Sequence, residues 1–461
     1  MRGGKTLLYI LSIAGFIAVL YFVLSAGKGL QAAHMAGVQY VSSGAALKHD
    51  VASAFRHPLP IFILQLAMIL VASQVFGYLF KKIGQPAVMG EIVAGILLGP
   101  SLMGALLPGF SAFLFPATSM GNLQMLSQVG LILFMFVIGM ELDIEVLKKQ
   151  AGAAILISHF SIVIPFASGV ALAYFLYEKY APAGVTFYAF ALFTGIALSI
   201  TAFPVLARII KERGIANTKL GTIALTAAAV GDVTAWCALA LIIAIARAGS
   251  LSASLYTIMW AVVHVAVMFF VIRPLLQKLA VNASRDKLIK RSRLAIIFLI
   301  MLGSAYACEI IGIHALFGAF LAGVIMPHDW NFRKLLIDKI EDVALVLLLP
   351  LFFVFTGLRT HIGLINNPAL WGVCLIIIAV AVAGKFGGSA LAAKLAGERT
   401  KDSLSIGALM NTRGLVELVV LNIGYDMHIL TPEIFTMMVM MALVTTFMTN
   451  PLMNIIERVY K

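Results

Sequence analysis

Residues 220–249 read LGTIALTAAAVGDVTAWCALALIIAIARAG and place one carboxylate, Asp232, in the middle of an otherwise apolar run. About 20 helical residues are enough to cross the hydrocarbon core of a bilayer, so this run predicts a transmembrane helix. Asp232 lies 13 residues after Lys219 and 15 residues before Arg247, so we expect it near the bilayer centre. An ionised group at that depth costs at least about 2.5 kcal/mol, which indicates a functional role.

A lone carboxylate in apolar surroundings can accept either a proton or a hard monovalent cation, because both compete for the same oxygen atoms. Small neighbours, Ala227 to Ala229 and Gly231, leave room for an ion beside Asp232. We therefore expect Asp232 to bind a monovalent metal cation and a proton in turn. The alternative is a carboxyl group that is kept protonated or paired for structural reasons alone.

The preceding apolar segment, 184–210, is interrupted by polar residues and a proline in ALSITAFPVLARII. Pro204 removes a helix hydrogen bond, and Ser199 and Thr201 place hydroxyl groups at the break. We expect these two residues to lie at the ion-binding and proton-binding site.

A second segment, 403–424, is interrupted in ALMNTRGLVELVV. The two interrupted segments are an odd number of crossings apart, so they run in opposite directions, as an inverted repeat requires. Opposed half-helix ends near the middle of a membrane create ion sites from backbone dipoles.

Three charged residues are candidates for support of the site. Lys385, in GKFGGS, is the expected counter-charge of Asp232, although it could instead extend to the membrane surface. Arg413 and Glu417 are four residues apart on one helix, so they either neutralise each other or act at the site.

The composition supports a membrane protein throughout, with 62% hydrophobic residues, 11% charged residues and a mean hydropathy of +1.03. Because helices satisfy their own backbone groups in lipid, we predict an all-α membrane protein with about 13 or 14 transmembrane helices. The expected segments are 6–26, 58–80, 86–107, 122–142, 152–177, 184–210, 219–246, 255–277, 294–312, 314–327, 343–362, 369–393, 403–424 and 433–456.

The distribution of charge predicts the orientation. Most of the 33 Lys and Arg residues fall on one side when the segments alternate, and that side is expected to be cytoplasmic, together with both termini. The net charge of +13 is thus explained by topology, without a nucleic acid partner. Residues 1–57 are expected to form an anchoring helix and an external connection, with a cleaved signal as the alternative, and 58–461 the transport domain.

No nucleotide-binding or zinc-protease motif is present, and the three cysteines have no zinc-binding spacing. We therefore expect a protein that is not an enzyme and that needs no cofactor beyond the ions it transports.

Eight blocks in order resemble the Kef-type and CHX-type branch of the monovalent cation:proton antiporters, whose fold is similar to that of NhaA-like exchangers. The blocks are GQPAVMGEIVAGILLGPSLMG, VGLILFMFVIGMELD, SITAFPVLARII, AAAVGDVTAW, HALFGAFLAGVIMP, PLFFVFTGLRT, GKFGGS and MNTRGLVELVVLNIG.

The resemblance implies that Asp232 is the ion- and proton-binding aspartate, that Thr201 and Arg413 belong to the two unwound helices, and that Lys385 is the basic residue of a partner helix. It also implies a homodimer in a bacterial inner membrane, with a core bundle formed by 152–246 and 369–456 that slides against a dimerisation bundle.

Gly231 stands where some relatives carry Asp or Asn, so one carboxylate is expected at the site. That favours an electroneutral exchange of one Na⁺ or K⁺ for one H⁺. The alternative is a K⁺ channel without proton coupling, although no T-V-G-Y-G filter is present to support it.

Overall fold

The computed structural model describes residues 58–141, 152–215, 218–248, 251–281, 291–327 and 330–460, with four single positions among the first 57. The predicted anchoring helix at 6–26 and the predicted external connection after it lie outside the described residues. The chain separates into two units, Met1–Ile61 and Phe62–Lys461, and the helices described here lie in the second unit, except that the first of them begins at Pro58.

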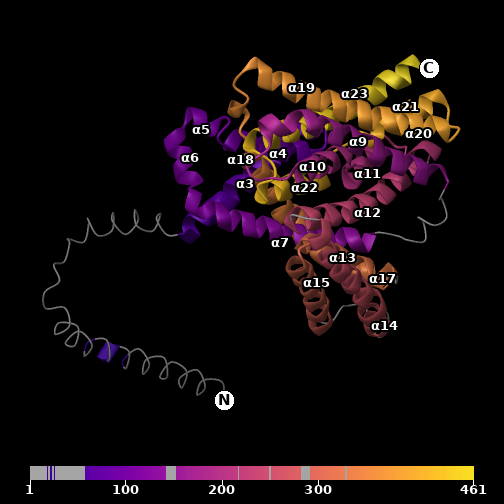
Figure 1. Ribbon diagram of the computed structural model, residues 1–461. Coiled ribbons are helices and arrows are strands. Elements are labelled where there is room, and N and C mark those ends of the chain that lie inside the picture. The colour runs from indigo at the N-terminus through magenta and orange to yellow at the C-terminus, as the bar shows by residue number, and fades with distance from the viewer. Residues whose placement is uncertain are drawn as a thin grey trace. The chain divides into compact units, whose positions relative to one another are not determined.

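The described part of the chain is almost entirely helical (Figure 1). Its principal helices are α3 (Pro58–Lys82), α4 (Ala87–Leu98), α7 (Ala117–Glu141), α9 (Ala153–Tyr180), α10 (Phe187–Ser199), α11 (Phe203–Glu212), α12 (Lys219–Ala248), α13 (Leu251–Val267), α14 (Arg273–Val281), α15 (Arg291–Ile311), α16 (Ala315–Val324), α17 (Trp330–Val343), α18 (Leu349–Arg359), α19 (Pro368–Val382), α20 (Gly388–Leu395), α21 (Thr400–Met410), α22 (Leu415–Asp426) and α23 (Pro432–Val459).

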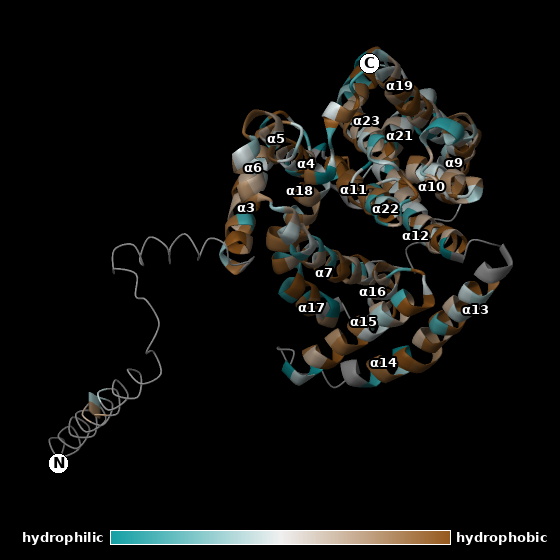
Figure 2. Cartoon of the chain, turned by 60° about the vertical axis from the view of Figure 1, so that its left-hand side comes forward, coloured by the Kyte–Doolittle hydropathy of each residue, from teal (hydrophilic) through white to brown (hydrophobic). Residues whose placement is uncertain are grey.

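Length and apolar composition make ten of these helices or joined helices long enough to cross a membrane, and Figure 2 shows apolar residues along most of their length. The pair α21 and α22 adds a span bent by 42°, and α10 and α16 are shorter apolar helices. Every segment predicted after residue 57 has its counterpart here, so the predicted all-α membrane fold is confirmed. One predicted boundary moves, because the helix expected at 343–362 is continuous with α17 and begins at Trp330.

The helices pack in two groups. The crossing bundle contains α9 to α12 and α19 to α23, which pack chiefly on one another. The scaffold bundle contains α3, α4, α7 and α15 to α18, joined by the pairs α4–α18, α7–α16 and α15–α16 and by a cluster of apolar side chains from α3, α4, α7 and α18. Close main-chain approach between the groups is limited, with α18 and α22 as one such pair, but one buried apolar cluster extends across both groups and includes the stacked rings of Trp236 and Phe320. The assignment of these groups as core and dimerisation bundles stays a prediction.

Glycines bring the scaffold helices into backbone contact. A Cβ atom on Gly95 of α4 would lie 2.1 Å from the carbonyl oxygen of Val354, and a Cβ on Gly357 of α18 would lie 2.3 Å from that of Ile92. These distances leave no room for a side chain, so α4 and α18 meet through their main chains, as small residues allow in membranes.

Both predicted helix interruptions are present. α10 ends at Ser199 and α11 begins at Phe203, with Pro204 in its first turn, where a missing N–H costs nothing. α21 ends at Met410 and α22 begins at Leu415. Two short non-helical peptides, 200–202 and 411–414, therefore lie inside the crossing bundle.

Candidate functional site

The two non-helical peptides cross each other and are hydrogen-bonded together. The backbone N–H of Ala202 donates to the carbonyl oxygen of Thr412 at 3.0 Å. The hydroxyl of Thr201 donates to the carbonyl of Met410, the last residue of α21, at 3.3 Å. The peptide 200–202 thus donates hydrogen bonds to carbonyl groups at and after the end of α21, which lack partners within that helix.

Arg413 binds the carbonyl end of α10. Its guanidinium donates to the carbonyls of Ala197 at 2.9 Å and Leu198 at 2.7 Å, and its side chain is fully buried. These carbonyls belong to the last turn of a helix, where partial negative charge gathers and a cation is stabilising.

Lys385 completes that arrangement from the other side. It is fully buried within a π-helical turn, Ala383–Gly387, and its Nζ donates to the carbonyls of Ser199 and Ser161. The Ser161 carbonyl lacks a helix partner because Pro165, four residues later in α9, has no N–H to donate. Lys385 therefore does not extend to the membrane surface.

Threonines of α23 hold the second non-helical peptide. Thr446 accepts from the backbone N–H of Arg413 at 3.0 Å and donates to the carbonyl of the same residue at 2.8 Å. Thr449 shares a hydrogen bond of 3.3 Å with the Thr412 hydroxyl. These contacts hold the non-helical peptide 411–414 in place between its two half-helices.

Asp232 is buried in α12 and is 4% exposed. Its Oδ1 makes no hydrogen bond, and none of the ion pairs between described side chains includes it. Lys385 acts on it electrostatically from beyond ion-pair distance. The predicted counter-charge thus lies near Asp232 without binding it, because its hydrogen bonds go to backbone carbonyls.

Further polar atoms near the crossing also lack partners. The hydroxyl of Ser158 in α9 is buried and would lie 3.4 Å from a Cβ built on Gly231, directly before Asp232. The hydroxyl of Thr194 in α10 is likewise buried and without a hydrogen bond. Carboxylate and hydroxyl oxygens are ligands that hard cations prefer, so the residues present fit a monovalent cation as cargo.

Glu417 lies in the first turn of α22, where a negative charge complements the helix dipole. Its carboxylate is 3.3 Å from the Arg413 guanidinium, and both side chains are fully buried. The ion pair of Arg413 with Glu417, one of the two alternatives that their spacing allowed, is therefore present. Arg413 also binds the end of α10. Ser199 directs its hydroxyl to the carbonyl of Gly195 at 2.6 Å, so that hydroxyl already has an acceptor.

Sequence reasoning placed the charged residues at the crossing but missed Pro165, Ser158 and the threonines of α23. Pro165 carried a readable signal, because a proline in an apolar helix frees a carbonyl for another donor. The threonines carried none, since hydroxyls in membrane helices commonly bond within their own helix.

The chain is similar to known proteins both in sequence and in fold. The family model described as sodium/hydrogen exchanger, transmembrane, matches residues 67–455. The Na(+)/H(+) antiporter NhaS4 of Synechocystis is 42% identical over 84% of this chain and 94% of its own length. Cation/H(+) antiporter 17 of Arabidopsis thaliana is 41% identical over 86% of this chain, which spans about half (48%) of that protein. The structure of the sodium proton antiporter MjNhaP1 from Methanocaldococcus jannaschii aligns with a TM-score of 0.62 at 16% identity, covering 86% of this chain and 96% of that one.

Proposed function

The chain belongs to the transmembrane sodium/hydrogen exchanger family, and we propose that it exchanges Na⁺ or K⁺ for H⁺ at a single carboxylate, Asp232. Cation:proton exchange is the activity in the names of its relatives NhaS4 and cation/H(+) antiporter 17. In this exchange the cation and the proton bind in turn to the Asp232 carboxylate, each replacing the other.

The observation that carries the proposal is the isolation of Asp232. A carboxylate in the interior of a membrane helix, with an oxygen that bonds to nothing in the protein, is costly when charged and empty. A proton or a cation removes that cost, and either one leaves the site with the same net charge. The other buried charges, Lys385, Arg413 and Glu417, are already bound to helix ends or to each other.

The division of the helices into two bundles supports an alternating-access mechanism. We propose that the crossing bundle moves against the scaffold bundle and carries Asp232 from one side to the other. The protein is proposed to lie in a bacterial inner membrane as a homodimer, with both termini cytoplasmic. The orientation rests on the excess of Lys and Arg on one side.

Proteoliposomes with an acidic interior and a pH-sensitive dye test the assignment. Addition of Na⁺ or K⁺ should dissipate the gradient for the unaltered protein and leave it intact for Asp232→Asn, which cannot exchange a proton at that position. Asp338→Asn, the same change at an exposed residue of α17, is the matched control and should retain full activity.

Undiminished exchange by Asp232→Asn would remove the proposal. A channel without proton coupling would admit the cation and leave the proton gradient unchanged unless a proton carrier were added, so the same assay separates the two activities.

A further inference from the structure

The interface between the two bundles is hollow at one end and filled at the other. At the predicted cytoplasmic end, a cavity of about 440 Å³ is lined by the α3–α4 connection and by α11 and α23. At the predicted external end, α7, α16, α18 and α22 enclose only about 20 Å³, room for about one water molecule. The structure is therefore closed toward the predicted external side.

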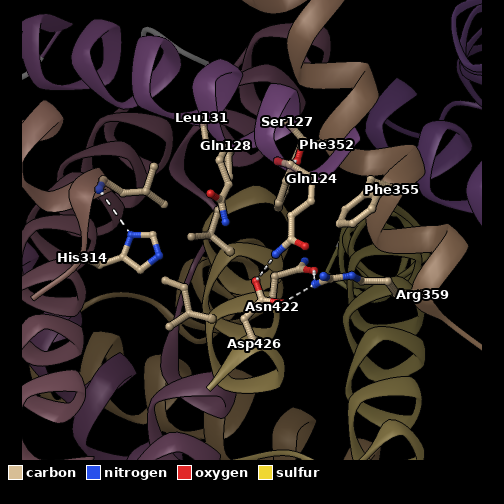
Figure 3. A pocket seen from close by; sticks show the side chains of 13 residues that line it. Gln124, Ser127, Gln128, Leu131, His314, Phe352, Phe355, Arg359, Asn422 and Asp426 are labelled. Atoms are coloured by element: carbon tan, nitrogen blue, oxygen red, sulfur yellow. Dashed lines mark hydrogen bonds and ion pairs between the residues drawn. The ribbon is translucent and has the colours of Figure 1, made fainter. Parts of the chain in front are cut away.

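Charged and polar bonds cross the interface at the filled end (Figure 3). The guanidinium of Arg359, the last residue of α18, is 2.7 Å from Asp426, the last residue of α22. Gln124 of α7 donates to the other oxygen of Asp426 at 3.1 Å. Both carboxylate oxygens of one residue in the crossing bundle are thus bound by residues of the scaffold bundle.

The environment of Arg359 orients it toward this contact. Its guanidinium lies 4.4 Å from the centre of the Phe355 ring and 5.4 Å from that of Tyr425, and it also donates to Asn422 at 3.2 Å. These contacts stabilise a cation and limit its freedom of rotation. With 15% of the Arg359 side chain and 31% of the Asp426 side chain exposed, the pair is partly shielded from solvent.

At the hollow end, the contacts between the bundles include two hydrogen bonds to main-chain carbonyl groups. There Asn450 donates to the carbonyl of Gly84 at 2.7 Å, and Gln85 donates to that of Phe447 at 3.4 Å. The charged contact of Arg213 with Glu457 joins α11 to α23, two helices of the same bundle. The ion pair of Arg359 with Asp426, in contrast, joins the two bundles at the filled end.

We propose that Arg359 and Asp426 form a latch that holds the external mouth of the exchanger closed. They position α22 against α18, and their bond must break before the crossing bundle can expose Asp232 to the predicted external side. This inference rests on the proposed exchange at Asp232, but the latch residues belong to a separate cluster that does not contact that carboxylate.

Accessibility of two reporter cysteines tests the latch without measuring transport. Cys237, Cys308 and Cys374 are first replaced, and Val419→Cys, buried at the filled end, or Phe447→Cys, which lines the hollow end, is introduced. A membrane-impermeant maleimide is added to right-side-out vesicles for the first reporter and to inverted vesicles for the second. Each labelling rate is compared with and without Arg359→Gln, which removes the charge.

We expect Arg359→Gln to raise the labelling rate of the Val419→Cys reporter by about five- to tenfold, which is the change in population expected from the loss of one contact at the interface. The labelling rate of the Phe447→Cys reporter should fall. Arg359→Lys, which keeps the charge, should label more slowly than Arg359→Gln.

Unchanged rates, or rates that rise at both reporters, would overturn the latch, the second result because it indicates general loosening. Equal rates for the lysine and glutamine variants would also overturn it. The same changes are expected in an Asp232→Asn background, so failure of the latch is distinguishable from failure of the exchange assignment.

Discussion

The buried charged residues at the crossing differ in their partners within the protein. Three of them bind main-chain carbonyls or each other, and the fourth, Asp232, has no ion pair with a described side chain. Lys385 and Arg413 bind carbonyls at the end of α10, and Glu417 is paired with Arg413. Both carboxylates have buried oxygens without a hydrogen bond, but Glu417 has an ion pair with Arg413, whereas Asp232 has none with a described side chain. This difference supports the proposal that Asp232 binds the transported ions and that the other charged residues stabilise the helix ends.

Replacement of Lys385 by alanine should lower stability more than it lowers exchange per folded molecule. The change leaves the carbonyls of Ser161 and Ser199 buried without a donor, at a cost of about 1 to 3 kcal/mol. Thermal unfolding of the purified protein in detergent measures the effect. Lys394→Ala, at an exposed lysine nearby, should unfold as the unaltered protein does, and equal melting temperatures for both variants would contradict the argument.

Arg413 and Glu417 should show strong coupling in a double-mutant cycle. Arg413→Met leaves a buried carboxylate without its partner and should cost about 3 to 5 kcal/mol. Adding Glu417→Gln should recover part of that loss, because the double variant no longer buries the Glu417 carboxylate without its partner. Free energies of unfolding in mixed micelles measure the four corners of the cycle, and strictly additive losses would show that the 3.3 Å contact carries no interaction energy.

At the scale of helices, the scaffold bundle is held by main-chain contact at glycines. The helices α7 and α16 meet through their main chains, as α4 and α18 do. A Cβ on Gly139 would lie 2.2 Å from the carbonyl oxygen of Phe320 and 3.0 Å from the Cα of Gly323. Such contacts maximise van der Waals packing where lipid removes the hydrophobic driving force between helices.

Gly139→Ala should therefore force α7 and α16 apart and destabilise the protein by about 1 to 3 kcal/mol. Gly121→Ala lies on the same helix, where nothing approaches within 4 Å, and should be neutral or slightly stabilising. Melting temperatures of the two variants in one detergent provide the comparison. A Gly139→Ala protein as stable as the Gly121→Ala protein would show that the contact is not tight.

Most of the helices and both interruptions could be predicted from the sequence, because lipid requires long apolar runs and a buried charge stands out within them. The hydrogen bonds could not. Nothing in the spacing of Lys385 indicates that the carbonyl freed by Pro165 lies within its reach. That contact depends on the approach of two helices distant in sequence, and the same is true of the bond between Thr446 and the backbone of Arg413.

At the scale of the whole molecule, one ion-binding carboxylate limits the charge that can be moved. If Asp232 carries either one monovalent cation or one proton, each full cycle transfers no net charge. Exchange of Na⁺ should then be insensitive to a membrane potential imposed with a gradient of the permeant anion thiocyanate, which avoids K⁺ because K⁺ is itself a proposed substrate. A net charge would respond strongly, because 100 mV is worth about 2.3 kcal/mol per charge. Rates that change severalfold with the sign of the potential would exclude the 1:1 stoichiometry.

The basic side chains at the end of α10 bear on the stability of the proposed exchanger in the state that has a proton bound in place of the metal cation. Lys385 and Arg413 donate to carbonyl groups at the end of α10 and so stabilise the interrupted helix through the protein's own side chains, whichever ion is bound. Removal of Na⁺ and K⁺ should therefore leave the fold intact, because the cation-bound and proton-bound forms of the proposed exchanger differ only in the ion at Asp232.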